Sequence, residues 1–273
     1  MRAPPTLPPR PTSMLHTSAE QIAPTEALLW PVPRVRPTLK VGEAHVWAAS
    51  LDQPAASVRA LESLLSLQEL NRAERFRNEA DRRRYVVAHG ILRRVLAGYR
   101  KSSPRALRFT IGKNGKPALS DESGPTALRF NLSHTEDIAL IAVTLGREIG
   151  VDVERVRPIS ELDSIVESYF TSHERDTLST MENTARRDAF YRCWTRKESY
   201  AKATGGDLSV ALSGFDTMLS SGPADLPSVD EPQESAGWNL YELLPAGGYV
   251  GAVAINGPVG RLLSWRWTEG TPQ

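Results

Sequence analysis

The longest apolar stretch of this chain lies near its centre, at residues 138–145, and only Thr144 interrupts it. A membrane-spanning helix needs roughly 20 apolar residues, so this stretch is too short to be one. Its length and apolar content instead predict a buried strand over residues 138–144. A turn at residues 146–148 and a second strand over 149–154 follow it. We therefore expect the two strands to pair as a hairpin.

Other segments alternate between strand and helix patterns without a regular strand–helix–strand rhythm. Strands are predicted at 44–48, 107–111, 238–244 and 249–255, the last two as a closing hairpin. Helices are predicted within 61–76, over 81–99 after Asp81, over 161–169, from a capping box at Thr171 to Glu174, and over 185–202 after Thr184. Mixed short elements of this kind predict an α+β fold.

The first forty residues differ in composition from the rest, because nine of them are proline. Proline fixes one backbone angle and removes a hydrogen-bond donor, so regular ladders are disfavoured there. We expect residues 1–40 to be a mostly disordered, passive leader and the ordered chain to begin at Glu43.

Charge and cysteine content limit the possible partners and compartments. The 273 residues carry 33 basic and 32 acidic side chains, a net charge of +1, so the chain is no polycation that binds nucleic acid or membranes through its total charge. Cys193 is the single cysteine and permits no internal disulfide, which indicates a reducing compartment. The N-terminal residues lack an apolar signal core. We expect a cytoplasmic protein of one large or two ordinary domains.

The segment Gly150–Glu154 could bind a metal. Side chains alternate along a strand, so Asp152 and Glu154 share one face, roughly 6–7 Å apart. They form either a solvated polar face or part of a Mg²⁺ site, since Mg²⁺ prefers one or two carboxylates together with substrate phosphates.

A second cluster lies in the predicted helix 185–202. Trp194, Glu198 and Lys202 recur every four residues and share a face. An ordinary glutamate–lysine helical pair explains this spacing as well. However, a core-facing Trp194 would place both charges near the core boundary, where charges need partners. A shared metal ion would satisfy Glu198, and a bound phosphate would satisfy Lys202.

Two further groups are less specific. Ser133 and His134 precede the buried strand, where a structural role is the alternative, and no Gly-x-Ser-x-Gly elbow supports a serine hydrolase. A basic group could bind phosphate or be a solvated helix face; it comprises Arg72, Arg75, Arg77, Arg82, Arg83, Arg84, Lys113 and Lys116. A phosphate-binding P-loop motif is absent from the sequence.

Together these pieces resemble the 4′-phosphopantetheinyl transferase superfamily, in its two-domain type. The resemblance covers roughly residues 43–256 and rests on ordered motifs at 116–117, 130–134, 149–154 and 194–202. It implies two similar α+β halves related by a pseudo-twofold axis, which we place at 41–146 and 147–273. It also implies that coenzyme A and Mg²⁺ bind in the cleft between the halves, with the metal site carried by the second half.

The resemblance also assigns roles to single residues. Asp152, Glu154 and Glu198 are expected to bind Mg²⁺, and Lys202 to face the reacting phosphate. The other expected coenzyme contacts are Ser133, His134, Lys116, Arg84 and Arg72. The sequence departs from the family pattern at Gly205–Leu208 and at Gln68 and Glu69.

The implied reaction transfers 4′-phosphopantetheine from coenzyme A to a serine of an apo carrier protein and releases adenosine 3′,5′-bisphosphate. The carriers would serve polyketide, nonribosomal-peptide or fatty-acid synthases, and a monomer would suffice. Glu198, Glu174 or a metal-bound water could accept the serine proton.

Two other functions remain open. A metal-dependent nuclease or phosphodiesterase would commonly place its glutamate and lysine two residues apart on a strand, whereas Glu198 and Lys202 are four apart. A nucleic-acid-binding module would need a basic domain with stacking aromatic residues. We expect no nucleic-acid or membrane partner.

Overall fold

The structure is a computed structural model that describes residues 30–112, 115–120, 124, 127–205, 216–217 and 237–272. Most of the expected leader, residues 1–29, lies outside the described residues, as do Lys113 and the segment 206–208. No helix in the described ranges is long and apolar enough to cross a bilayer.

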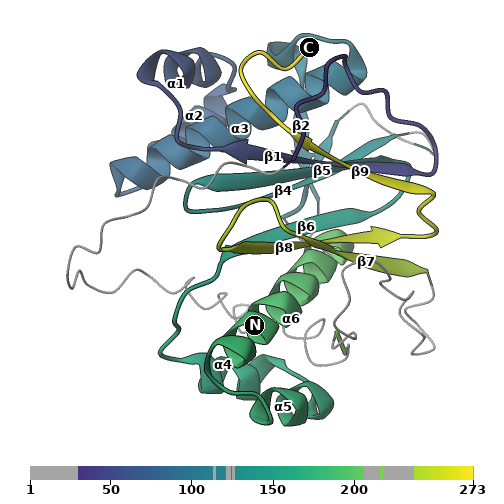
Figure 1. The fold of residues 1–273 in the computed structure, drawn as a ribbon. Coiled ribbons are helices and arrows are strands. Elements are labelled where there is room, and N and C mark those ends of the chain that lie inside the picture. Colours follow the sequence, from purple (N-terminus) through teal and green to yellow (C-terminus); the bar gives the residue numbers. More distant parts are fainter. Residues whose placement is uncertain are drawn as a thin grey trace, which may run out of the picture.

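The first half of the chain contains strands and helices in mixed order (Figure 1). Its elements are β1 (Glu43–Ser50), α1 (Ala55–Glu62), α2 (Leu67–Ala73), α3 (Glu79–Arg100), the 3₁₀ helix η1 (Pro104–Ala106), β2 (Phe109–Ile111), β3 (Pro117–Leu119), β4 (Leu128–Thr135) and β5 (Ile138–Leu145).

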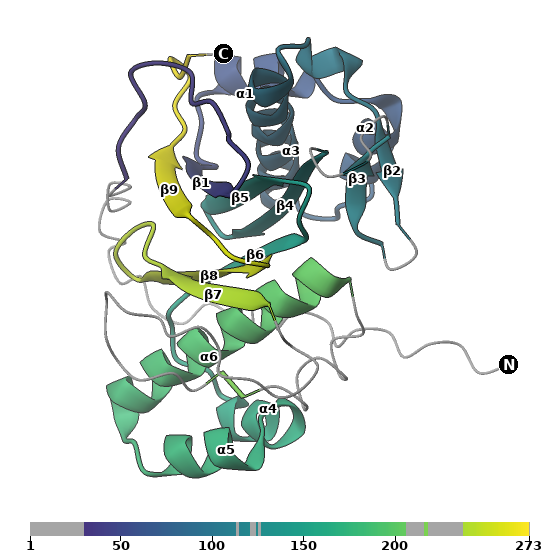
Figure 2. The same ribbon diagram turned by 90° about the vertical axis from the view of Figure 1, so that its right-hand side faces the viewer.

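The second half contains β6 (Ile149–Arg155), α4 (Leu162–Tyr169), α5 (Ser172–Ser179), α6 (Asn183–Thr204), β7 (Trp238–Leu243), β8 (Tyr249–Asn256) and β9 (Arg261–Arg266). The described strands form one sheet in the order β4-β5-β1-β9, a second in the order β6-β8-β7, and the small pair β2-β3. Figure 2 shows that pair beside α2.

The two large sheets pack face to face between two long helices, which gives the layer order α3, first sheet, second sheet, α6 (Figure 1). Alternate residues of β1 and β5 face opposite layers: Val46 and Leu140 pack against the second sheet, whereas Trp47 and Ile141 pack toward α3. Both faces of these strands are buried, which explains their continuous apolar sequence. The predicted α+β fold with two similar halves is confirmed.

The hairpin predicted from residues 138–154 is wrong, although both strands exist. β5 pairs with β4 along one edge and with β1 along the other, so neither edge is open to β6. β6 pairs with β8 in the second sheet instead. The turn at 146–148 therefore carries the chain from one sheet to the other. The predicted closing hairpin of β7 and β8 is confirmed.

The chain ends of the described region cross between the halves. β9 lies beside β1 in parallel, although its residues belong to the second half in sequence. Residues 30–40 also pack on the fold: the Arg266 amide donates to the Pro31 carbonyl, and Trp30 packs against the core between the sheets. The division of the chain into two halves at residues 146–147 remains a prediction. β9 follows that division in sequence but belongs to the sheet of the first half.

Helix ends agree only partly with the sequence patterns. The capping box of Thr171 and Glu174 is confirmed at the start of α5. Asn78, rather than Asp81, caps α3, because its side chain accepts from the Ala80 amide at 2.9 Å. Helix α6 begins at Asn183, before the predicted cap Thr184. Gly205, with φ 63°, ends it as predicted.

A buried ion pair fixes the short helix α2 to α3. The Arg93 guanidinium, 1% exposed, donates to both carboxylate oxygens of Glu69 at 2.7–3.2 Å. Burial alone would raise the pKa of Glu69, but hydrogen bonds from His89, Arg93 and Ser66 lower it from 4.5 to about 2. Glu69 is a position where the sequence departs from the family pattern, and here it serves as the anchor of α2.

The change Glu69→Gln should lower the free energy of unfolding at pH 7 by about 3 kcal/mol, because it leaves Arg93 buried beside a neutral partner. The lowered pKa also makes this loss of stability depend on pH. The Glu69 contribution is complete above pH 4.5 and is lost as the pH falls toward 2, so the difference between wild type and variant should shrink by about 3 kcal/mol over that interval. Urea unfolding at several pH values measures it. A difference that stays constant from pH 7 to 2 would contradict the assignment.

Helix α6 touches β6 backbone to backbone at Gly150. A Cβ atom placed on Gly150 would lie 2.1 Å from the Ser199 carbonyl oxygen and 2.4 Å from the Ala203 nitrogen. No side chain fits there. Gly150 therefore sets how close the residues around Ser199 and Ala203 come to the face of β6 that carries Asp152.

Gly150→Ala should lower the free energy of unfolding by at least about 2 kcal/mol, since two backbone segments must separate. Gly98 in α3 provides the matched control, because its added Cβ meets nothing within 4 Å. Gly98→Ala should raise stability by up to about 1 kcal/mol through helix propensity. Equal effects of the two substitutions in urea unfolding would refute the close-contact argument.

Candidate active site

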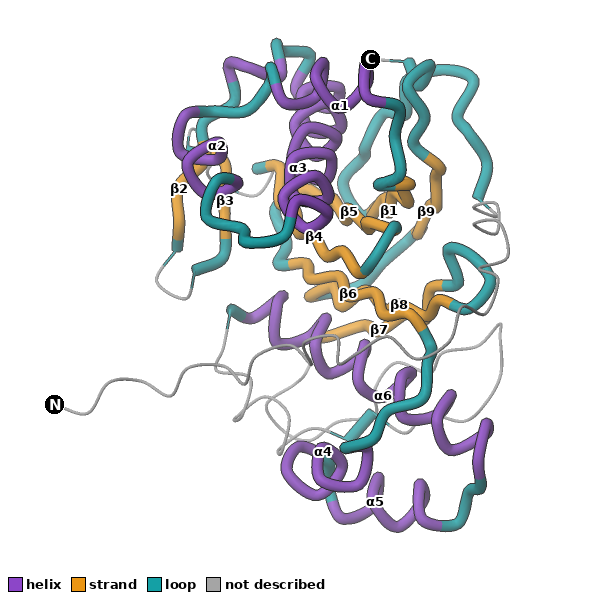
Figure 3. The backbone as a smooth tube through the Cα atoms, turned by 90° about the vertical axis from the view of Figure 1, so that its left-hand side faces the viewer, coloured by secondary structure: helices purple, strands orange, loops and turns teal. Residues whose placement is uncertain are grey.

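The two halves meet where β4 runs beside β6 (Figure 3). The two strands belong to different sheets, and the contacts between them come from side chains that alternate along β4. Asn131 Oδ1 accepts from the Val151 amide at 2.9 Å, and Thr135 Oγ1 donates to Glu154 Oε2 at 3.2 Å. Ser133 lies between them and donates to Asp152 Oδ1 at 2.8 Å. Side-chain hydrogen bonds thus take the place of a backbone ladder between β4 and β6. We call this contact between the two strands the seam.

Three groups form the centre of the seam. The Lys202 ammonium donates to Ser133 Oγ at 2.9 Å and lies 2.5 Å from Asp152 Oδ1. Asp152 is 2% exposed, so this lysine neutralises a buried carboxylate. The groups come from β4, β6 and α6, so the site exists only when both halves are folded together.

The second oxygen of Asp152 is a candidate ligand for a cation. Oδ2 is buried and has no hydrogen-bond partner among the described residues. A buried carboxylate oxygen normally has a partner, and a hard cation such as Mg²⁺ is a suitable one. The donor chemistry at Asp152 therefore fits the expected metal.

The other two expected metal ligands lie nearby in the fold. Glu154 shares the α6-facing side of β6 with Asp152 and accepts from Thr135. Glu198 is half-buried on α6, one helical turn before Lys202. In the part of the chain that the structure describes, no three acidic, histidine or cysteine side chains are grouped closely enough to hold a metal. The ligand set of all three carboxylates remains a prediction.

Lys116 joins the two halves at the end of α6. Its ammonium lies 2.7 Å from Glu148 Oε2 and donates to the Ala203 carbonyl at 2.8 Å. Burial lowers the pKa of Lys116, and Glu148 partly opposes that effect. The bond to Ala203 fixes the helix position next to Lys202, and the expected contact to the coenzyme remains untested.

The other expected coenzyme contacts are distributed over the first half. Arg84 pairs with Asp81 at 3.3 Å and with Asp137 at 3.2 Å, in the turn after β4. His134 follows Ser133 on β4, so alternation places the two side chains on opposite faces.

Arg72 is exposed on α2, with its guanidinium 6.0 Å from the centre of the Tyr85 ring of α3. It lines a hollow of about 660 Å³ together with Gln68, Asn71, Arg75 and Phe76. Two arginines, two amides and an aromatic ring suit a charged ligand.

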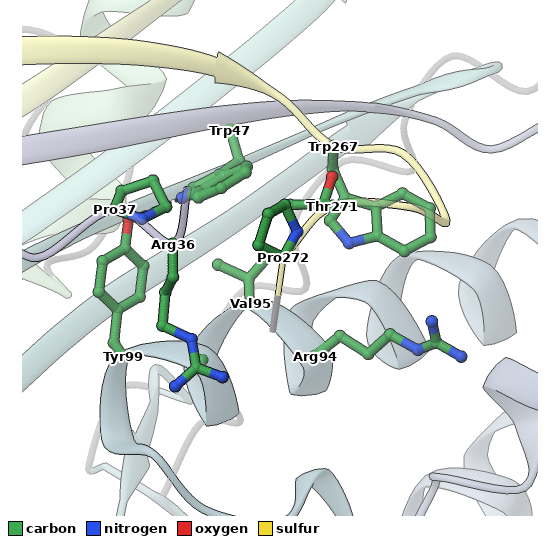
Figure 4. A pocket seen from close by; sticks show the side chains of 10 residues that line it. Arg36, Pro37, Trp47, Arg94, Val95, Tyr99, Trp267, Thr271 and Pro272 are labelled. Atoms are coloured by element: carbon green, nitrogen blue, oxygen red, sulfur yellow. Dashed lines mark hydrogen bonds between the residues drawn. The ribbon is translucent and has the colours of Figure 1, made fainter. Parts of the chain in front are cut away.

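A second cavity is small and lies elsewhere, between α3 and the ends of β1 and β9 (Figure 4). Its volume is about 20 Å³, enough for about one water molecule. Trp47, Tyr99 and Trp267 line it, and the Trp47 indole donates to the Tyr99 hydroxyl at 2.9 Å. None of the predicted site residues lines this cavity, and a coenzyme cannot enter it.

Glu174, one of the possible general bases, is placed away from the site. It is fully buried, pairs with Lys197 at 2.9 Å, and accepts from the Thr217 amide and hydroxyl at 2.8 Å. A carboxylate engaged on both oxygens under α6 cannot receive a proton from an incoming serine. The prediction that Glu174 could be the base is therefore wrong.

Sequence reasoning missed the residues that build the seam. Asn131 and Thr135 flank Ser133 at a spacing of two, which is a readable signal once residues 128–135 are known to form a strand. Lys197 had no such signal, because its partner Glu174 lies on another helix.

Comparison with known proteins gives two family matches that adjoin. Residues 46–145 match the model described as 4′-phosphopantetheinyl transferase, N-terminal, and residues 148–254 match the 4′-phosphopantetheinyl transferase superfamily. The boundary between the matches coincides with the turn from β5 to β6.

Curated relatives carry the same description. The chain is 38% identical over 220 residues to the 4′-phosphopantetheinyl transferase HetI of Nostoc sp., which covers 81% of this chain and 90% of that protein. It is 29% identical to the 4′-phosphopantetheinyl transferase Sfp of Bacillus subtilis, over 58% of this chain and 67% of that protein. The L-aminoadipate-semialdehyde dehydrogenase-phosphopantetheinyl transferase of Xenopus laevis is 28% identical, over 69% of this chain and 67% of that protein.

The seam bond from Asn131 can be tested by substitution. Asn131→Ala leaves the buried Val151 amide without its acceptor and should lower the free energy of unfolding by about 1–3 kcal/mol. Amide hydrogen exchange at Val151 should also accelerate. Asn239→Ala is the control. The Asn239 side chain donates to the Gly257 carbonyl at 2.9 Å, outside the seam, so this substitution should leave hydrogen exchange at Val151 unchanged. Unchanged Val151 exchange in Asn131→Ala would rule out the seam bond.

Proposed function

Because the chain belongs to the 4′-phosphopantetheinyl transferase superfamily, it transfers 4′-phosphopantetheine to carrier proteins, and we propose that Ser133, Asp152 and Lys202 form the centre of that reaction. The observation that supports this proposal is the contact of all three groups at the seam between the matched halves. The donor is coenzyme A, as in the family, and the proposed second product is adenosine 3′,5′-bisphosphate.

Transfer of a phosphoryl-linked group spreads negative charge over phosphate oxygens, so catalysis depends on positioned cations. Lys202 supplies one such cation. In the present structure its charge is balanced by Asp152, at 2.5 Å. A diphosphate that reaches the seam gives the ammonium a second anion to bind, and Ser133 Oγ is within hydrogen-bond reach of the same place.

Mg²⁺ is the proposed cofactor, held by Asp152 with Glu154 and Glu198, and it would neutralise charge on the diphosphate when bound. The unsatisfied Oδ2 of Asp152 supports this proposal. Glu198 is the proposed acceptor of the serine proton, directly or through a water molecule, because the other protein candidate, Glu174, is enclosed under α6.

The remaining basic residues are proposed to hold the coenzyme. Arg72 and Arg84 come from the first half and would bind the phosphate of the adenosine end, as guanidinium groups bind phosphate well. Lys116 and His134 would contact the rest of the nucleotide. All these groups come from one chain, so a monomer is sufficient.

The alternative of a nuclease or phosphodiesterase has no support from the family matches, which both describe transferases. The structure also places Glu198 and Lys202 on a helix, away from the strand arrangement that the alternative expects.

Transfer can be followed by intact-mass spectrometry of an apo acyl carrier protein incubated with coenzyme A and Mg²⁺. Asp152→Asn should lower kcat/KM by at least about 100-fold, because it removes the charge that organises the site. Calorimetric titration should show loss of Mg²⁺-dependent coenzyme A binding in the same variant. Asp188→Asn, a half-exposed aspartate on α6, is the control and should match the wild type. Normal transfer by Asp152→Asn would remove Asp152 from the centre of the site.

A further inference from the structure

The turn between β4 and β5 carries a glutamate that two arginines of the other half hold. Glu136 Oε2 lies 2.6 Å from Arg155 Nη1, and its Oε1 lies 3.1 Å from Arg157 Nη1. The arginine side chains are 43% and 50% exposed, and Glu136 is 26% exposed. A partner from solvent can therefore reach both guanidinium groups.

This arginine pair borders the proposed reaction centre. Arg155 follows Glu154 directly, and Glu136 follows Thr135, the residue that donates to Glu154. Arg155 is the last residue of β6 and Thr135 the last of β4, so the pair lies at the end of the contact between these two strands.

Packing contacts position the Arg155 guanidinium and the backbone of Arg157. Arg155 lies over the Tyr249 ring at 5.8 Å, and the Tyr191 hydroxyl from α6 donates to the Arg157 carbonyl at 3.2 Å. A binding surface that is already positioned loses little freedom when a partner arrives.

Fold stability alone does not account for Glu136. Its φ of 43° is one that residues with side chains rarely adopt, and a two-residue turn usually places glycine or asparagine there. Ion pairs at this degree of exposure contribute little to stability. The site nevertheless contains a carboxylate held by two arginines, which shows the chemistry that the pair recognises.

We infer that Arg155 and Arg157 form a docking site for carboxylates that flank the acceptor serine of the carrier protein, and that Glu136 occupies this docking site in the free enzyme. The inference rests on the proposed function. A carboxylate of the partner replaces Glu136 without a change in the number of ion pairs. The exchange therefore adds little net affinity. It orients the carrier protein and makes its rate of association dependent on salt.

The test measures KM separately for an apo acyl carrier protein and for coenzyme A, at low salt. Wild-type transfer must be seen first; if it is absent, the proposed function fails and the docking site is not in question. The double variant Arg155→Ala/Arg157→Ala should raise KM for the carrier about 10-fold and leave KM for coenzyme A unchanged. The effect should shrink at high salt. Arg175→Ala, which breaks an exposed pair between Arg175 of α5 and Glu167 of α4, should change neither value.

Glu136→Gln separates docking from a structural role. If the arginines dock the carrier, removing their internal competitor should lower KM for the carrier about 2-fold or more, opposite to the arginine variant. If they only support the turn, both variants should impair transfer alike, and that result would overturn the inference. A carrier whose flanking aspartates and glutamates are changed to asparagine and glutamine should lose sensitivity to the arginine variant; full retained sensitivity would equally overturn it.

Discussion

The close approach of α6 to β6 at Gly150 is the constraint on which the site depends. A helix resting on an ordinary residue would stand farther from the strand and would carry the backbone of Lys202 away from Asp152, which its ammonium now approaches to 2.5 Å. Gly150 and Asp152 share one face of β6, so the residue that permits the contact and the residue that uses it are two positions apart. The opposite face, with Val151 and Val153, is fully used in the core between the sheets. One strand therefore packs the two halves together and carries the candidate ligands.

The seam between the halves shows why the site is polar yet well ordered. β4 and β6 meet at sheet edges, where exposed backbone groups would be costly if left without partners. Asn131 satisfies one such amide, and Ser133 and Thr135 direct their hydroxyls to the two carboxylates of β6. Lys116 closes the same seam from the β3 side by bonding the last turn of α6. Because these bonds link separate sheets, a change that loosens the packing of the halves should disturb the reaction centre even when it touches no reacting group.

The sequence predicted those features that depend on local periodicity. Alternation placed Asp152 and Glu154 on one strand face, and the helical repeat placed Glu198 and Lys202 on one side of α6; both elements exist where expected. Strand pairing could not be predicted in this way. Whether β6 pairs with its sequence neighbour or crosses to β8 depends on which edges of β5 are already occupied, and β1 and β4 occupy both. For the same reason nothing local indicates that β9 lies beside β1. Glu174 illustrates the limit for single residues, since its suitability as a base depends on burial under a helix that follows it in sequence.

The reaction centre and the arginine pair beside it contain the same kind of internal ion pair. At the centre, a lysine from one element neutralises the buried Asp152, and at the edge two arginines from one half hold Glu136 of the other. In each case the protein supplies its own counter-charge where a substrate with the opposite charge has to bind. Such internal pairs keep cations oriented before the substrate arrives, which lowers the cost of organising them during the reaction. The pairs also must be exchangeable. The side chains of Lys202, Arg155 and Arg157 stay partly exposed, at 22%, 43% and 50%, whereas Lys197 and Glu174 beneath α6 are fully buried, and this exposure is what allows exchange.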